Sequence, residues 1–368
     1  MNQFAERIRN NSFIKNVLSL SSGVIIGQII STVGMPIISR IYTAADMGDY
    51  TLITSSANVI IAISVLGMLT VFMLPAKDSE ARELCRLVTL STIVISIVCV
   101  IFLYLISPWW RILSTEKISY SIALVVLWSY VVLSSVNNIC YAYVNRMRMY
   151  KVLFWNPILG AAVNISFGIV FGLLGWGVVG YTLAHVISMF ANIFHLVIHA
   201  NPFSSIPQSE RIGYKKLLIS YQRFPKYQMP ANLISNIAIQ IPLEIMNITF
   251  SATVLGYYSM ANRILSMPIA LLATPINRVY FQEASRRHQR GEDIAEFGYK
   301  IMESNIKIAI IPIVILMVFG RWIFAFILGS QWAEAGSYAA MLGIYFLVTF
   351  CVNCLSGSFV IIGKSSWN

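Results

Sequence analysis

Long runs of apolar residues dominate the chain, and short polar connections separate them. The ten runs are about 17–39, 50–74, 88–107, 120–143, 152–174, 177–199, 227–250, 253–279, 303–320 and 336–362. About 20 apolar residues in a helix span the hydrocarbon layer of a membrane. A β-barrel would instead alternate apolar and polar residues in segments of about ten. The pattern therefore predicts an all-α polytopic membrane protein with about ten transmembrane helices.

Two segments of the chain echo each other. Residues 42–52 read YTAADMGDYTL, residues 250–260 read FSATVLGYYSM, and each lies between two long apolar runs. Membrane proteins built from two like halves are typically transporters, with the substrate site where the halves meet. We therefore predict two pseudo-repeated lobes around a central cavity.

The predicted lobes differ in length. We place the N-terminal six-helix lobe at 1–205, a cytoplasmic inter-lobe loop at 206–226 and a four-helix C-terminal lobe at 227–368. Shifting the first half by the repeat spacing maps Lys364 close to the loop after the fourth helix. We therefore expect a chain that lacks the last two helices of a six-plus-six plan, as a truncated product or a natural short form.

The distribution of charge adds a prediction of how the chain is oriented in the membrane. The chain has a net charge of +11, but only 11% of its residues are charged and 57% are hydrophobic. Basic residues gather in every second connection, beginning with the N-terminus. The positive-inside rule then places the N-terminus and the basic loops in the cytoplasm. Charge divided so regularly is a topology signal, and we expect no nucleic-acid partner.

Each half also contributes one helix with polar side chains at every fourth position. The first run holds Gln28 and Thr32 at this spacing, and the seventh holds Asn232, Asn236 and Gln240. Residues four apart lie on one face of a helix. Because lipid penalises such a face, we predict that both rows face protein or a wet cavity.

Charged side chains inside apolar runs are the sharpest candidates. A helix starting near Thr253 would place Arg263 about 15 Å deep, where an arginine is functional or paired. It could bind phosphate bidentately or form an ion pair with Glu244. Glu244 could equally be a proton or cation site, and both interpretations stay open. Arg40 lies near the outer end of the first run, where its side chain can reach the interface.

Two further polar residues complete the candidate set. Asn58 would lie about 12 Å into the second helix, lining the cavity or bonding another helix. Lys226 precedes the seventh run. The i, i+4 pair Glu303 and Lys307 is expected to be a simple surface pair.

No catalytic motif is present, because Walker A, GxSxG, HExxH and dinucleotide fingerprints are all missing from the sequence. We expect no catalytic residue and no cofactor. His195 and His199 are four residues apart, but no third ligand is evident nearby, so no metal site is expected.

Four segments of the chain form a recognisable series. They are Met35-Pro36-x-x-Ser39-Arg40-Ile41-Tyr42 with Asp46-Met47-Gly48; Leu74-Pro75-Ala76-Lys77-Asp78; Phe224-Pro225-Lys226-Tyr227 with Leu255-Gly256-Tyr257-Tyr258 and Arg263; and Leu328-Gly329-x-x-Trp332. Their order and spacing resemble those of bacterial polysaccharide (O-antigen unit) flippases. These belong to the polysaccharide transporter branch of the multidrug/oligosaccharidyl-lipid/polysaccharide exporter superfamily. The resemblance covers essentially the whole chain.

The resemblance implies a two-lobed protein of the bacterial inner membrane that works by alternating access. It implies that an undecaprenyl-diphosphate-linked oligosaccharide moves from the cytoplasmic to the periplasmic leaflet, through a cationic cavity to which Arg263 and Arg40 contribute. The cargo would be an O-antigen or a capsular or exopolysaccharide repeat unit. The implied partners are the lipid bilayer, a proton or sodium ion, a polysaccharide polymerase and a chain-length regulator.

Other function classes stay open. A drug or small-solute cation antiporter of the same superfamily would favour an acidic cation site, which only Glu244 offers. A membrane-embedded polymerase or glycosyltransferase of the same pathway would need a long outer loop with catalytic charges or a soluble nucleotide-sugar domain. An inactive fragment is a further alternative.

Overall fold

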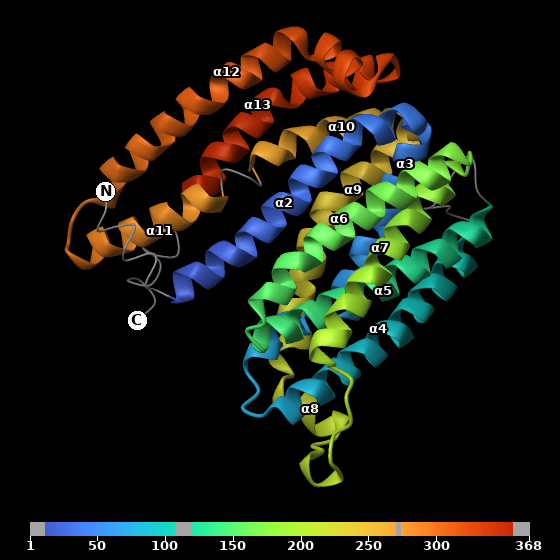
Figure 1. The fold of residues 1–368 in the computed structure, drawn as a ribbon, viewed down its shortest axis with the longest axis vertical. Helices are drawn as coiled ribbons and strands as arrows, with labels where there is room; N and C mark the ends of the chain where they lie inside the picture. The colour runs from blue at the N-terminus through green and yellow to red at the C-terminus, as the bar shows by residue number, and fades with distance from the viewer. Residues whose placement is uncertain (1–11, 108–118, 270–273, 356–368) are drawn as a thin grey trace. The chain divides into compact units, whose positions relative to one another are not determined.

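The computed structural model describes residues 12–107, 119–269 and 274–355, and this part of the chain is helical with no strand (Figure 1). The α-helices are α2 (Ser12–Ile41), α3 (Ala44–Ser64), α4 (Asp78–Ile106), α5 (Tyr120–Arg146), α6 (Tyr150–Leu173), α7 (Gly177–Ala200), α8 (Tyr214–Ser220), α9 (Met229–Thr249), α10 (Ala252–Pro268), α11 (Thr274–Gln289), α12 (Ile294–Leu328) and α13 (Ala333–Leu355). The prediction of an all-α protein is confirmed.

Seven helices of the described residues are long and apolar enough to cross a membrane. They are Ser22–Ile41, Asp78–Ile106, Tyr120–Arg146, Tyr150–Leu173, Gly177–Ala200, Ile294–Leu328 and Ser330–Asn353. Large apolar side chains on them are exposed, such as Leu105, Val125 and Phe326. Apolar surface on this scale needs lipid as its solvent.

The described residues form two compact units, one up to Leu255 and one from Gly256. The core of the first lies where α3, α5 and α7 face one another, around the fully enclosed side chains of Ile53, Ala57 and Leu127. In the second unit, α12 and α13 lie side by side (Figure 1). Trp332 at their turn is fully buried and packs edge-on against Tyr257, so two of the recognised segments meet there.

Some helices begin and end elsewhere than predicted. The helix predicted at 50–74 is α3, which ends at Ser64 because Leu66 and Gly67 take left-handed φ values of 53° and 65°. The 3₁₀-helix η1 (Met68–Met73) follows. The run predicted at 253–279 corresponds to α10 and the start of α11; residues 270–273 and the end of the run predicted at 336–362 lie outside the described residues.

Helix α12 is longer than the predicted 303–320. Its first turns are polar, and ion pairs of 2.6 Å from Lys300 to Glu296 and from Lys307 to Glu303 support them. Such i, i+4 pairs stabilise helical turns whose side chains bury little apolar surface. The predicted surface pair of Glu303 and Lys307 is confirmed.

The echo in the sequence is also an echo in local structure. The Thr43 hydroxyl accepts a hydrogen bond from the main-chain N–H of Asp46 and caps α3. The Ser251 hydroxyl accepts one from the N–H of Val254 at the start of α10. Both are helix N-caps with the same three-residue spacing. The two segments also touch, because a Cβ on Gly48 would collide with the Ala252 carbonyl.

Candidate transport site

Glu244 joins α9 to α3 within the first unit. Its Oε1 accepts hydrogen bonds from the hydroxyls of Ser55 at 3.0 Å and Ser56 at 2.7 Å. Its Oε2 is enclosed and accepts no hydrogen bond from the described part of the chain. A buried carboxylate oxygen without a donor is costly when it carries charge. That Glu244 is a proton or cation site, or a counter-ion for Arg263, stays a prediction.

The hydrogen bonds of the Ser55 hydroxyl bear on the protonation state of Glu244. Its hydroxyl lies 2.9 Å from the main-chain oxygen of Leu52 and 3.0 Å from Oε1 of Glu244. A hydroxyl has one hydrogen and can also accept. A protonated Glu244 would donate to Ser55, leaving the Ser55 hydrogen for Leu52. The contacts at Oε1 are thus compatible with a carboxylic acid at Glu244, which would donate to Ser55 and still accept from Ser56, while Oε2 has no donor among the described residues.

The predicted polar rows lie on half-buried faces of α2 and α9. On α2, the Thr32 hydroxyl donates to the main-chain oxygen of Gln28 at 2.8 Å. On α9, the Asn236 amide donates to the main-chain oxygen of Asn232 at 2.9 Å, and Gln240 is buried. These bonds run along each helix. Whether both rows line one cavity stays a prediction.

The remaining candidates occupy different environments. Arg40 is exposed at the end of α2, and Lys226 is exposed in the π-helix η3 (Phe224–Gln228), with its ammonium 5.3 Å from the Tyr227 ring centroid. Asn58 is half-buried on α3, three residues beyond Ser55 and so on nearly the same face. Arg263 is half-buried in α10, and its pairing with Glu244 stays a prediction.

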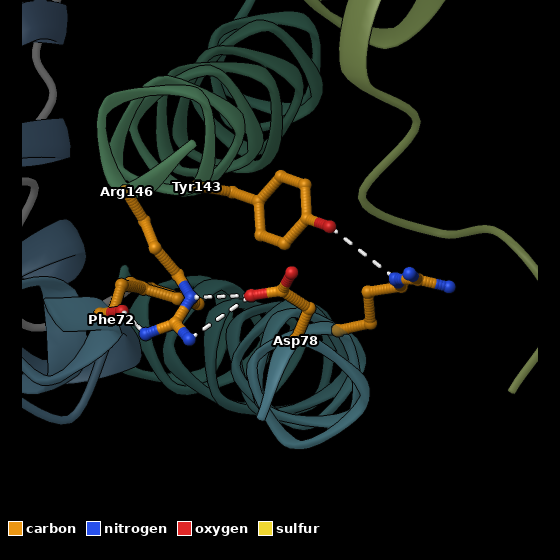
Figure 2. A network of polar contacts seen from close by, with 5 residues as sticks. Phe72, Asp78, Tyr143 and Arg146 are labelled. Atoms are coloured by element: carbon orange, nitrogen blue, oxygen red, sulfur yellow. Dashed lines mark hydrogen bonds and ion pairs between the residues drawn. The ribbon is translucent and has the colours of Figure 1, made fainter. Parts of the chain in front are cut away.

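A polar network closes the basic end of the first unit (Figure 2). Arg146 at the end of α5 donates to Oδ1 of Asp78, from Nε at 3.2 Å and from Nη2 at 3.1 Å, and to the main-chain oxygen of Phe72 at 3.1 Å. Arg82 on α4 donates to the Tyr143 hydroxyl at 3.3 Å. Together these bonds join η1, α4 and α5.

The segment that links the predicted lobes is bound to the same end of α4. Glu83 is buried, and its two carboxylate oxygens accept from the main-chain N–H groups of Ile212 at 2.8 Å and Gly213 at 2.9 Å. Arg86 donates to the main-chain oxygens of Phe203 and Ser204 at 3.0 and 2.7 Å. Sequence reasoning missed this anchor, because an acid near the start of α4 gives no signal that its partners are main-chain groups.

An aromatic side chain completes the anchor. The Tyr221 hydroxyl donates to Glu80 at 3.0 Å. Burial and the neighbouring Glu80 carboxylate raise the pKa of Tyr221 to about 12, so the hydroxyl stays protonated and donating at neutral pH. Leu217 of α8 is fully buried against the same end of the bundle. The linker is therefore a packed part of the first unit.

Glu83→Ala should release this linker. The main-chain N–H groups of Ile212 and Gly213 would lose a charged acceptor, at about 1.5–3 kcal/mol for each hydrogen bond. Hydrogen exchange of amides 211–217 should then accelerate by roughly 30-fold or more. Glu210→Ala removes the same charge from an exposed position in the linker and should leave the exchange unchanged. Equal exchange in both variants would show that Glu83 does not hold the segment.

Comparisons with known proteins agree with this architecture. The family described as polysaccharide biosynthesis protein matches residues 37–337. Among solved structures, the chain resembles a multidrug resistance MATE family transporter of the MOP superfamily in its outward-facing conformation, with a TM-score of 0.56 and 16% identity over 96% of this chain and 83% of that one. The inward-facing conformation of such a transporter gives 0.54 and 15%, over 95% and 82%.

A third similar structure is a MOP superfamily transporter from Pyrococcus furiosus, with a binding pocket described as of reverse polarity. Its TM-score is 0.54 at 16% identity, over 96% of this chain and 83% of that one. At such identities the likeness shows the fold alone. A comparison with curated proteins finds no match.

The apolar helices and the fold define a multi-pass membrane protein with the architecture of MOP-superfamily transporters. The chain belongs to the polysaccharide biosynthesis protein family.

Proposed function

We propose that this protein is a flippase that translocates an undecaprenyl-diphosphate-linked oligosaccharide across the bacterial inner membrane by alternating access. The cargo would be an O-antigen or a capsular or exopolysaccharide repeat unit, moving from the cytoplasmic to the periplasmic leaflet. The observation that carries the proposal is the polysaccharide-family match on a transporter fold. In a polysaccharide pathway, such a transporter would carry an intermediate that cannot cross the lipid bilayer unaided.

The chemistry of this cargo fits the candidate residues. Its diphosphate and its glycan need shelter from hydrocarbon, whereas its lipid tail does not. Arg263 and Arg40 would neutralise the diphosphate, because one guanidinium group can donate two parallel hydrogen bonds to phosphate oxygens. The amide rows of α2 and α9 would offer hydrogen bonds to sugar hydroxyls, and the tail would remain in the bilayer.

The basic end of the first unit supports the proposed orientation. The start of α4 with Arg82, the end of α5 with Arg146 and the linker with the exposed Lys215 and Lys216 all lie at this end. By the positive-inside rule this end faces the cytoplasm. The N-terminus would then be cytoplasmic as well.

Glu244 adds a coupling step to the proposal. Its enclosed carboxyl group would bind a proton in one state of the cycle and release it in another, so that an ion gradient drives transport. The same residue favours a second candidate function, which is a drug or small-solute antiporter. The two differ in cargo: the antiporter would leave lipid-linked glycan untouched.

Loss of the gene tests the proposal. Surface glycan should disappear, and lipid-linked single repeat units should accumulate in the cytoplasmic leaflet, because synthesis continues without export. An intact copy of the gene should restore the glycan. Unchanged surface glycan would contradict the proposal, and unpolymerised units on the outer face would point instead to a polymerase.

A further inference from the structure

A pocket of about 350 Å³ opens between two turns of the first unit, the one joining α2 to α3 and the one joining α6 to α7. Its walls include Asp46, Trp176, Gly177 and Val179. Both turns lie at the end of the bundle opposite the α3–α4 and α5–α6 connections, since successive long helices reverse direction. In the proposed topology the pocket therefore faces the periplasm.

Trp176 gives the pocket a fixed aromatic wall. Its ring stacks on that of Phe171, with centroids 4.9 Å apart and planes inclined by 4°. Phe171 covers one face of the indole, while 49% of the Trp176 surface stays exposed. An aromatic face held in this way is an apolar platform that needs no further ordering when a ligand arrives.

Asp46 gives the pocket a buried acceptor. The residue is 4% exposed, and its Oδ2 accepts from the main-chain N–H of Thr43 at 3.0 Å and from the Thr43 hydroxyl at 2.6 Å. Its Oδ1 lies beside Gly177, where an added Cβ would sit 3.0 Å from that oxygen. The carboxylate is thus fixed in the wall by the helix cap.

The residues that line the pocket favour some classes of ligand over others. A diphosphate would meet a carboxylate and no basic side chain among the residues that line this pocket. A neutral sugar ring has the matching features, because its C–H face can lie on an aromatic ring and its hydroxyls can donate to a carboxylate. The volume is at the lower end of the range for small-molecule pockets, which suits a single ring or two.

We propose that this pocket binds one neutral sugar ring of the cargo glycan on the periplasmic side of the protein. This inference rests on the proposed function. Two separate sites would then recognise the cargo. Basic side chains elsewhere in the protein would bind the diphosphate, and Trp176 and Asp46 would bind the glycan. Cargo choice would then follow the shape of this pocket.

Binding of a free glycan tests the proposal without any transport assay. The probe is the oligosaccharide released by mild acid from the host's own lipid-linked unit, titrated calorimetrically into the purified full chain. Trp176→Ala should weaken binding by about tenfold, and Trp176→Phe by less, because a ring remains. Trp155→Ala is the matched control, since Trp155 is exposed near the opposite end of α6 and does not line the pocket.

A second variant guards against indirect effects on folding. Val179→Phe narrows the pocket without touching the Asp46 cap and should also weaken binding by about tenfold. Wild-type affinity in both Trp176→Ala and Val179→Phe would overturn the proposal, as would a wild-type protein that binds no glycan or binds sodium ions there instead. If the gene deletion still accumulates lipid-linked units, the proposed function would stand while this pocket fails.

Discussion

Arg263→Ala should abolish translocation of the lipid-linked unit while the protein remains in the membrane at its usual level. Arg263 is half-buried and lies about 16 Å along α10 from Ala252 at the usual helical rise. In the proposed membrane-spanning arrangement, a guanidinium at such a depth is retained for a ligand or a partner. Losing a desolvated charge contact costs about 2–5 kcal/mol, so transport should fall by about 30-fold or more.

The measurement is the amount of lipid-linked unit that reaches the periplasmic leaflet in cells that carry each variant. Arg263→Lys keeps the charge but not the paired geometry and should restore part of the activity. Arg321→Ala is the control, because Arg321 is an exposed arginine of the same unit that pairs with Glu334 at 2.9 Å. Wild-type glycan in Arg263→Ala cells would argue against a cavity role for Arg263.

Glu244→Gln should uncouple transport from the proton gradient. The amide keeps the size of the protonated side chain and can still bond Ser55 and Ser56, so the packing of α9 on α3 should survive. It cannot release a proton, however. The stimulation of transport by a pH gradient should fall by about five- to 150-fold, which is the usual range of coupling between two bound ligands.

Everted membrane vesicles with an imposed pH gradient provide the measurement. Glu303→Gln is the matched control, since Glu303 is exposed and paired with Lys307 at the surface. Ser55→Ala and Ser56→Ala should each weaken the coupling without removing it, because one hydroxyl remains. A Glu244→Gln protein that still responds fully to the gradient would remove Glu244 from the coupling step.

The sequence predicted the fold well because hydrophobic runs of spanning length leave few alternatives to membrane helices. The helix ends were harder to predict. The end of α3 depends on the left-handed backbone of Leu66 and Gly67, and Gly67 lies against Gln228 and Met229, far along the chain. The first turns of α12 depend on ion pairs, to which a hydrophobicity pattern is blind.

The candidate site was predictable only in part. An acid such as Glu244 inside an apolar run stands out because lipid penalises it. Its partners Ser55 and Ser56 do not stand out, because serines are common in membrane helices and nothing in the sequence pairs α3 with α9. Glu83 was missed for the same reason: its ligands are main-chain groups of the linker, and any residue type can supply those.

The docked linker has a consequence for dividing the gene. A fragment that stops at residue 205 would uncover the apolar seat of Leu217 and leave Glu83 buried without its two donors. Such a piece would aggregate or be degraded. Any division of the chain should therefore fall beyond Tyr221, so that the connecting segment stays with the bundle that holds it.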